Sequence, residues 1–446
     1  MIIKEANANS YDLCIIGTGP AGLTVANEFL NSKLKVLIID SSPSEYSDKK
    51  QSLNKGVNFN LHSDTNESIQ NEDYFLRSRK RAFGGTSKVW AGYTRPINQN
   101  FWNKNWPFPY TEIDPFYTLA KKTLDINENY VSDYLDSNLL FNPFNLSPPT
   151  RFKEKFFSII QKAKNVDCLL DNTITDINIS NDEVLSFVSV DSKKNKKVLK
   201  AKKFILCCGS LENTRLLLNW SHKNDVLSSP HLGKNFNDHL YFELKNSFFL
   251  TEGHNHFKNT KKRISAFSLK NNFFHKITLQ IEKESKDQSL APKGLKGTLY
   301  DSAVILTPQE KRKNKVYLDS SVCELGLKQI SINWQIDNIE YQKIRIFLKE
   351  LDKNFNLLGM GKINQKRFAL TSPEYGFLGY HPTGTTKMGK LKENSYVDTQ
   401  LKVHSTSNLY VLSNSVFPSS SYANPTLTIV ALAHRLSDHL KRRFKI

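Results

Sequence analysis

The fold is decided by residues 11–40, which read YDLCIIGTGPAGLTVANEFLNSKLKVLIID. The first six residues form a short apolar run with β-branched residues at its end, which is typical of a buried parallel strand. A glycine-rich turn follows, then a helical pattern of apolar side chains, and then a second apolar run over residues 35–39. The stretch therefore predicts a βαβ unit with two parallel strands side by side.

The turn carries the pattern G-x-G-x-x-G at Gly17, Gly19 and Gly22, and Asp40 closes the second strand. In such a unit the first glycine permits the tight turn, the second lets a pyrophosphate approach the backbone, and the third lets the helix pack on the strand. The free N–H groups of the helix would face the phosphates, and Asp40 would accept hydrogen bonds from ribose hydroxyls. We predict a dinucleotide site. The motif does not choose between FAD and NAD, and a glycine-rich turn without a ligand is the alternative.

Composition restricts the classes of protein. The chain has 446 residues, a formal charge of +19 and five cysteines without a CxxC pair. The length suggests two domains or one domain with a second lobe, and the cysteines favour neither a metal site nor a disulfide framework. The excess charge could serve nucleic acid or a membrane surface. Because the lysines are interspersed with acidic residues, we expect no nucleic-acid partner, and peripheral membrane association stays an alternative.

The first residues are polar, and the first apolar run is far too short to cross a membrane. This pattern predicts a cytoplasmic protein, unless it is exported with a partner that carries a signal.

Residues 77–90, RSRKRAFGGTSKVW, begin a resemblance to the glucose-methanol-choline (GMC) oxidoreductases, in which a similar loop lies along the flavin. Residues 204–218 and 232–239 resemble further segments of that family. The resemblance implies FAD as the cofactor, and Val89 stands where the covalent branch has a histidine, so we expect non-covalent FAD. By resemblance, the cofactor also contacts Arg81, Gly84, Gly85, Thr86, Ser87, Ile174 and Gly209.

Residues 379–389, GYHPTGTTKMG, and residues 408–433 resemble the C-terminal segment of the same family. There a histidine opens the first motif and an asparagine or histidine stands at the start of the last helix, and His381 and Asn424 occupy these positions. Histidine is the natural base near neutral pH, and asparagine can hold an alcohol oxygen. Asn424 before a proline also fits a helix N-cap. The resemblance places Ser415, Asn424, Pro425 and Thr426 at the cofactor.

The implied fold class is α/β, with a Rossmann-like FAD-binding domain interrupted by a β-sheet substrate-binding domain. We predict a first part of the FAD domain at residues 1–240 with the flavin loop at 77–95, a substrate-binding domain at 241–372, and a return to the FAD domain at 373–446. His239, in a turn that resembles the family, is expected to be structural.

The expected activity is removal of a hydride from a CH–OH group of a sugar, polyol or glycoside, because the layout looks closest to bacterial FAD-dependent sugar, polyol and glucoside dehydrogenases. The partners are then a small alcohol and an electron acceptor, which could be oxygen, a quinone or a protein. The alternatives are a GMC enzyme acting on an apolar substrate such as a sterol or fatty acid, and a basic flavin-fold protein that binds without catalysis.

Overall fold

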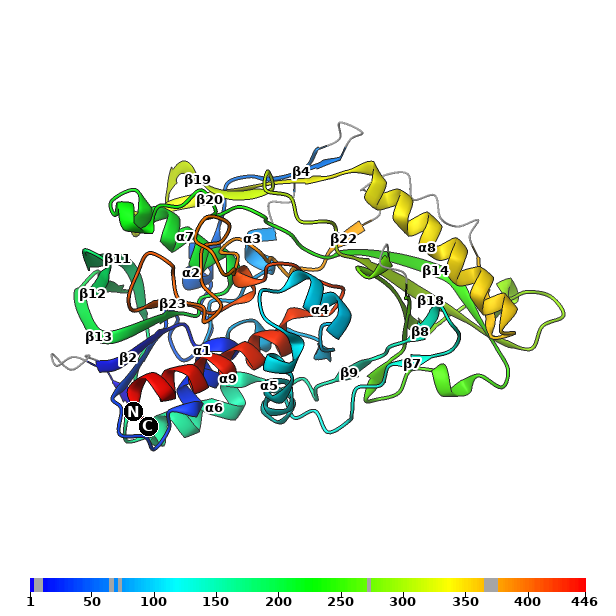
Figure 1. Cartoon of the computed structure of the whole chain (residues 1–446), viewed down its shortest axis with the longest axis horizontal. Helices are drawn as coiled ribbons and strands as arrows, with labels where there is room; N and C mark the ends of the chain where they lie inside the picture. The colour runs from blue at the N-terminus through cyan, green and yellow to red at the C-terminus, as the bar shows by residue number, and fades with distance from the viewer. Residues whose placement is uncertain (4–10, 64–67, 71–73, 271–273, 365–375) are drawn as a thin grey trace.

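The computed structural model describes residues 1–3, 11–63, 68–70, 74–270, 274–364 and 376–446. The molecule is elongated, with one large sheet near the chain termini and a second large sheet at the other end (Figure 1). Within the described ranges, no helix is both long and apolar enough to cross a membrane.

The first sheet confirms the predicted βαβ unit. Strands β2 (Tyr11–Ile16) and β3 (Val36–Ile39) pair in parallel, and helix α1 (Pro20–Glu28) connects them. The strand order is β1-β10-β3-β2-β13-β12-β11, and β23 pairs with β13. The other strands of this sheet are β1 (Ile2–Ile3), β10 (Val166–Leu169), β11 (Asn172–Ser180), β12 (Glu183–Asp191), β13 (Lys196–Leu206) and β23 (Leu409–Val411).

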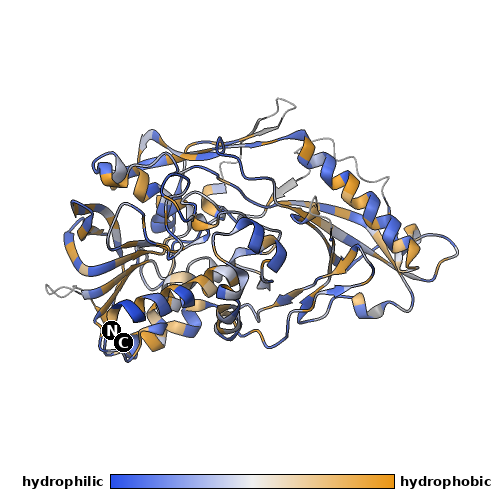
Figure 2. Ribbon diagram, viewed as in Figure 1, coloured by the Kyte–Doolittle hydropathy of each residue, from blue (hydrophilic) through white to orange (hydrophobic). Residues whose placement is uncertain are grey.

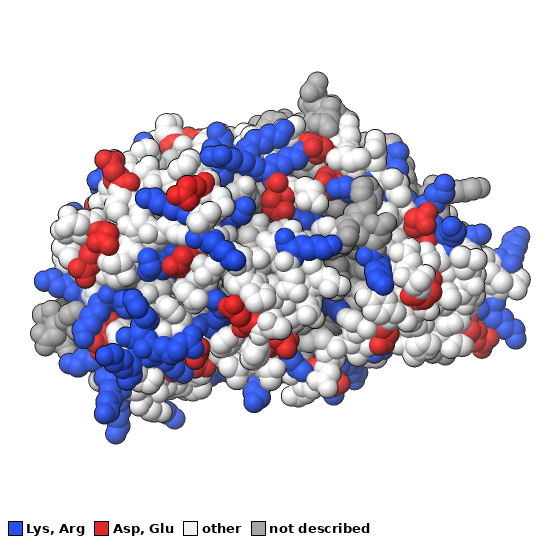
Figure 3. All heavy atoms as spheres, in the orientation of Figure 1, with Lys and Arg blue, Asp and Glu red and all other residues white. Residues whose placement is uncertain are grey.

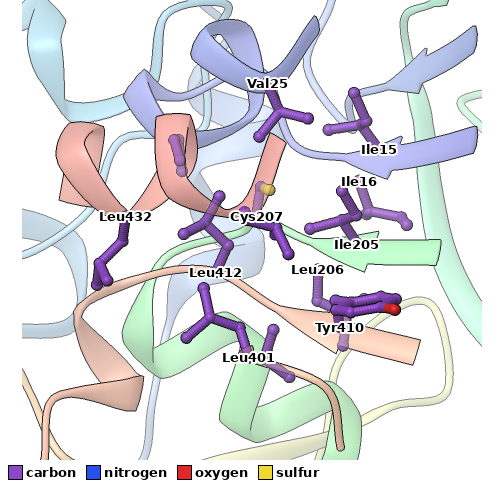
Figure 4. Packing of buried hydrophobic residues seen from close by; sticks show 14 of the residues in the cluster. Ile15, Ile16, Val25, Ile205, Leu206, Cys207, Leu401, Tyr410, Leu412 and Leu432 are labelled. Carbon is purple, nitrogen blue, oxygen red and sulfur yellow. The ribbon is translucent and has the colours of Figure 1, made fainter. Parts of the chain in front are cut away.

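Helices cover this sheet, in which strand β3 is apolar throughout. All four residues of β3 are buried, and α1 packs against the long C-terminal helix α9 (Pro425–Phe444). Figure 4 shows part of the resulting core, to which Ile15 of β2, Val25 of α1 and Leu432 of α9 contribute. The remaining helices near this core are α4 (Gln99–Asn105), α5 (Tyr110–Thr123), α6 (Phe152–Lys162) and α7 (Ser210–Ser221).

The second large sheet is antiparallel, with the order β21-β14-β18-β17-β16-β8-β7, and β22 pairs with β14. Helix α8 (Asn338–Leu357) packs on it, and the alternating blue and orange of this helix in Figure 2 reflects its amphipathic character. Its strands are β7 (Asp133–Tyr134), β8 (Leu139–Phe141), β14 (Leu240–Thr251), β16 (Ala266–Leu269), β17 (Ile277–Glu284), β18 (Gly297–Leu306), β21 (Gly361–Ile363) and β22 (Gly376–Leu378).

These two sheets give the predicted architecture of a Rossmann-like domain combined with a β-sheet domain. The second sheet takes strands from all three predicted sequence ranges, since β7 and β8 come before residue 240 and β22 comes after residue 372. The predicted boundaries stay a prediction.

Two smaller sheets join the large ones. One has the order β19-β20-β4-β5 and the other β15-β9-β6. The strands of the smaller sheets are β4 (Phe59–Ser63), β5 (Ser68–Gln70), β6 (Tyr93–Thr94), β9 (Phe144–Leu146), β15 (Arg263–Ile264), β19 (Lys315–Val322) and β20 (Lys328–Ile336), and two short helices are α2 (Asp48–Gln51) and α3 (Tyr74–Arg77).

Figure 3 shows Lys and Arg side chains gathered near the chain ends, where the last turn of α9 carries Lys441, Arg442 and Arg443.

Candidate active site

A cavity of about 600 Å³ is lined by both large sheets. The carboxyl ends of β2, β3 and β13 contribute to one side, where ligands of open α/β sheets bind. Strands β14, β17 and β18 of the second sheet contribute the other side through Tyr241, Gln280 and Ile305. The cavity therefore combines a dinucleotide-type site with a wall from a different domain.

The structure brings most of the predicted site residues together. Both predicted catalytic residues, His381 and Asn424, line the cavity. It is also lined by the predicted cofactor residues Gly17, Gly19, Asp40, Arg81, Gly85, Thr86, Ile174, Gly209, Pro425 and Thr426. The predicted cofactor residues Gly22, Gly84, Ser87 and Ser415 are not among the lining residues.

The three glycines of the first turn differ in what surrounds them. A Cβ on Gly22 would lie 1.9 Å from the carbonyl oxygen of Gly17, so this position needs glycine for packing. Gly17 has a φ of +109°. A Cβ on Gly19 would meet only the Cα of Gly85, at 4.0 Å. The protein alone thus gives no reason for glycine at position 19, which fits close approach of a ligand to the backbone.

The four predicted residues outside the cavity have identifiable structural roles. The amide of Gly84 donates to the carbonyl of Thr18 at 2.9 Å, which ties the 84–87 loop to the glycine turn. The Ser87 hydroxyl donates to the carbonyl of Gly84 at 2.6 Å. The buried Ser415 hydroxyl accepts from Thr386 at 2.6 Å. Together with Gly22, these residues shape the loops that surround the cavity.

The carboxylate of Asp40 already accepts four hydrogen bonds from the chain. Oδ2 accepts from the amide and hydroxyl of Thr18 at 2.8 and 2.6 Å, and Oδ1 accepts from the amide and hydroxyl of Ser42 at 2.8 and 2.6 Å. A carboxylate has about four acceptor sites. A ribose hydroxyl would therefore have to displace one of these two rotatable side-chain hydroxyls.

Beside the cavity, three guanidinium groups share one carboxylate. Glu212 lies 3.0 Å from Arg79, 3.0 Å from Arg81 and 2.9 Å from Arg215, and all four residues are buried. Burial lowers the pKa of Arg79 to about 9 against the opposing effect of Glu212. Because one negative charge faces three positive ones, the cluster favours an anionic group in the adjoining space.

Three helix N-termini also meet at the cavity, since its lining includes Pro20 of α1, Ser210 of α7 and Pro425 of α9. The positive end of a helix dipole and the free N–H groups of a first turn attract anions. Together with the arginine cluster and the open space at Gly19, they favour an anionic cofactor such as the predicted FAD.

The predicted base His381 contacts a second histidine that comes from a separate part of the chain. Its Nδ1 lies 3.2 Å from Nδ1 of His239, whose Nε2 lies 2.8 Å from the carbonyl oxygen of Ser421. A carbonyl only accepts, so Nε2 of His239 carries its proton. Burial lowers the pKa of His239 to about 4, so the ring is neutral near pH 7 and its Nδ1 is an acceptor.

The tautomer of His381 follows from this chain of bonds. Its Nδ1 must donate to His239, which leaves Nε2 of His381 without a proton. Burial and then the neighbouring His239 lower the pKa of His381 well below its ordinary value. His381 is therefore neutral near pH 7, with Nε2 able to accept a proton.

Asp238 holds the backbone beneath both histidines. Its Oδ1 accepts from the amide of His239 at 2.6 Å and from the amide of His381 at 2.7 Å, and its Oδ2 accepts from the hydroxyl of Tyr74. Burial raises the pKa of this carboxyl to about 7, against these hydrogen bonds. A single side chain thus fixes the spacing of the two rings.

Asn424 stands at the N-cap position of α9, as its sequence context predicts, but its side chain makes no capping hydrogen bond. The side-chain amide of Asn424 therefore does not cap α9, and Asn424 lines the cavity together with His381.

Residues 310–433 match the family model described as GMC oxidoreductase. The chain carries the C-terminal domain of a GMC oxidoreductase. This GMC domain contains His381 and Asn424. A stretch of 119 residues is 28% identical to 2-methyl-1,2-propanediol dehydrogenase of Mycolicibacterium austroafricanum, covering 27% of the chain and 21% of that protein. The chain spans only between 10% and 23% of the length of the curated relatives it matches.

Solved structures share the fold around this GMC domain over nearly the whole chain. Pyridoxine 4-oxidase from Mesorbium loti matches with a TM-score of 0.65 at 14% identity, covering 97% of this chain and 99% of the other. Formate oxidase of Aspergillus oryzae, studied for modification of its FAD, matches with a TM-score of 0.63 at 15% identity, covering 99% and 100%. At such identities the likeness establishes the fold.

Sequence reasoning missed several residues that the fold brings to the cavity. His239 was expected to be structural, yet it lines the cavity and contacts His381. Arg79 and Glu212 were not predicted at the site, although the acidic residue at the start of a helix after a glycine turn was a usable signal. Tyr241 and Gln280 lie on strands of the second sheet that carry no motif.

Proposed function

We propose that this chain is an FAD-dependent oxidoreductase that oxidises a CH–OH group. One observation carries the proposal. The same cavity is lined by the glycine turn, by His381 with its unprotonated Nε2, and by Asn424, whose side chain does not cap α9. The dinucleotide-type turn, the arginine excess and the three helix N-termini support FAD at this site.

In the proposed reaction, bound FAD supplies the hydride acceptor. Nε2 of His381 accepts the hydroxyl proton, because its other ring nitrogen already donates to His239. Asn424 holds the alcohol oxygen, since its amide is not used to cap α9. The N-terminus of α9, which begins at Pro425, supports negative charge that develops nearby.

We propose a polar alcohol, such as a sugar, polyol or glycoside, as the substrate class. The cavity wall of the second sheet carries Tyr241, Glu243 and Gln280, which suit a hydroxylated substrate better than a sterol or fatty acid. The diol in the name of one relative supports the same choice. The reduced cofactor would pass its electrons to oxygen, a quinone or a protein.

The proposal is tested by the absorbance spectrum of the purified protein during anaerobic addition of sugars, polyols and glycosides. We expect a spectrum of oxidised flavin that fades with at least one compound of the panel. Absence of flavin after reconstitution with FAD, or flavin that stays oxidised with every polar and apolar alcohol, would contradict the proposal.

A further inference from the structure

The second sheet presents a group of polar side chains to the cavity, which we call the polar wall and define as Tyr241, Glu243, Gln280 and Glu282. Glu243 of β14 and Gln280 of β17 both pair with Ala303 of β18, so their side chains share one face of the sheet. Tyr241 and Glu282 lie two residues away along β14 and β17 and share that face. Tyr241, Glu243 and Gln280 line the cavity.

Gln280 has an unmet hydrogen-bonding requirement. Its side-chain Nε2 donates to Oε1 of Glu282 at 3.0 Å, which fixes the amide so that Oε1 points elsewhere. Oε1 is buried and has no hydrogen-bond partner among the described residues. Gln280 as a whole is fully buried. A buried acceptor without a partner is costly, so its retention in a cavity wall calls for a ligand that satisfies it.

The other residues of the polar wall add further hydrogen-bond acceptors. The hydroxyl of Tyr241 donates to Oε1 of Glu282, so it is already used. Among the residues that the structure describes, neither Glu243 nor Glu282 forms an ion pair. Burial raises the pKa of Glu282. The polar wall therefore matches a ligand group that donates hydrogen bonds and does not match a carboxylate or phosphate.

Strand pairing also connects the polar wall to the proposed base. His239 immediately precedes β14, and β22, which runs toward His381, pairs with β14 at Leu240 and Tyr241. A substrate held with its reacting carbon near His381 would thus extend toward this wall.

We propose that the polar wall is a substrate subsite in which Oε1 of Gln280 accepts a hydrogen bond from a second hydroxyl or ammonium group of the substrate, carried on a carbon other than the one oxidised. This inference rests on the proposed function and narrows its substrate class to alcohols with a second donor. Simple monoalcohols and hydroxy acids are then poor substrates.

The test compares the binding of propane-1,3-diol, 3-aminopropan-1-ol, 3-hydroxypropanoate and propan-1-ol to the oxidised FAD-loaded protein by anaerobic calorimetry. We expect the diol or the amino alcohol to bind on the order of tenfold more tightly than propan-1-ol, as expected for one hydrogen bond to a buried group. The comparison of diol with amino alcohol tells which donor the wall prefers.

The matched variants are Gln280→Met, which keeps the side-chain length and removes the acceptor, and Gln329→Met on β20, away from the cavity. Gln280→Met should abolish the preference for a second donor, whereas Gln329→Met should keep it. Equal weakening of every ligand in Gln280→Met, or no preference in the parent protein, would overturn the subsite. If the preference is present but no alcohol reduces the flavin, the subsite stands and the proposed function fails.

Discussion

Nδ1 of His381 lies 3.2 Å from Nδ1 of His239, and the second ring is fixed in turn by the carbonyl of Ser421. Because this series of hydrogen bonds ends at a carbonyl oxygen, which can only accept, the positions of the protons on both rings are determined. The proposed base therefore depends on a residue more than a hundred positions earlier in the chain, which orients the base and need not touch the substrate.

The isosteric variants His239→Asn and His239→Leu test this dependence. Asparagine can place its Oδ1 where Nδ1 of histidine lies and accept from His381, while leucine cannot. We expect His239→Asn to keep most of the rate of flavin reduction and His239→Leu to lose on the order of 10-fold or more.

The accompanying measurement is ¹⁵N NMR of histidine-labelled protein, in which a protonated and an unprotonated ring nitrogen have distinct shifts. The parent should show His381 unprotonated at Nε2. A His381 ring protonated at Nε2 in the parent would contradict the assignment, whatever the activity.

Removal of the base itself gives the second prediction. His381→Ala should slow flavin reduction by about 10²- to 10⁴-fold, the usual contribution of a general base. His404→Ala is the control, because His404 bonds Ser395 and does not line the cavity. Stopped-flow absorbance under anaerobic conditions measures both. An unchanged rate in His381→Ala would remove His381 from the proposed role.

Asp238 makes stability depend on pH. Its pKa is about 7 in the folded protein and about 3.9 in an unfolded chain. Between these values the folded state binds more protons, so this group makes the protein less stable as pH rises from about 4 to 7, by at most about 1.4 kcal/mol per pH unit.

Asp238→Asn keeps an oxygen acceptor for the amides of His239 and His381 but cannot ionise. We therefore expect the apparent melting temperature of this variant, relative to the parent, to rise between pH 4 and pH 7. The difference cancels the titration of groups common to both proteins. A difference that stays constant over this range would show that Asp238 ionises normally.

The glycine turn gives a matched pair of variants. Gly22→Ala would bring a Cβ to 1.9 Å from the Gly17 carbonyl, so we expect loss of folded protein. Gly19→Ala meets only open space in the chain itself, with its nearest contact at 4.0 Å. It should fold with a near-normal melting temperature but bind FAD more weakly, measured by fluorescence titration. Equal FAD affinity in Gly19→Ala would argue that the cofactor does not approach this position.

The arginine cluster gives the last prediction. Glu212→Gln leaves Arg79, Arg81 and Arg215 buried without their shared counter-charge, and breaking a buried pair in this way typically costs about 3–5 kcal/mol. We expect a large fall in the melting temperature of the FAD-free protein. Bound FAD should restore part of the lost melting temperature, because its pyrophosphate supplies negative charge to the arginines. A variant as stable as the parent would show that the cluster does not need the carboxylate.

The sequence determined the features that depend on local pattern. The βαβ unit at residues 11–40 was predictable because strand, glycine turn, helix and strand each leave a signature within a few residues. The start of helix α9 was predictable because Asn424 before Pro425 is a typical helix N-cap followed by a typical first helical residue. The resemblance of residues 379–389 and 408–433 to a family indicated the C-terminal domain, which the match at residues 310–433 bears out.

Only the tertiary structure decided what lies around those motifs. The pairing of His381 with His239 and the contacts of Glu212 with Arg79 and Arg81 join residues far apart in the chain, and no local pattern encodes such contacts. The strand of Gln280 carries no sequence motif either. Gln280 is a candidate substrate contact because the fold brings its unpaired acceptor to the cavity. Sequence patterns report which element a residue joins, whereas the proton positions and unmet hydrogen bonds of a site depend on which elements meet.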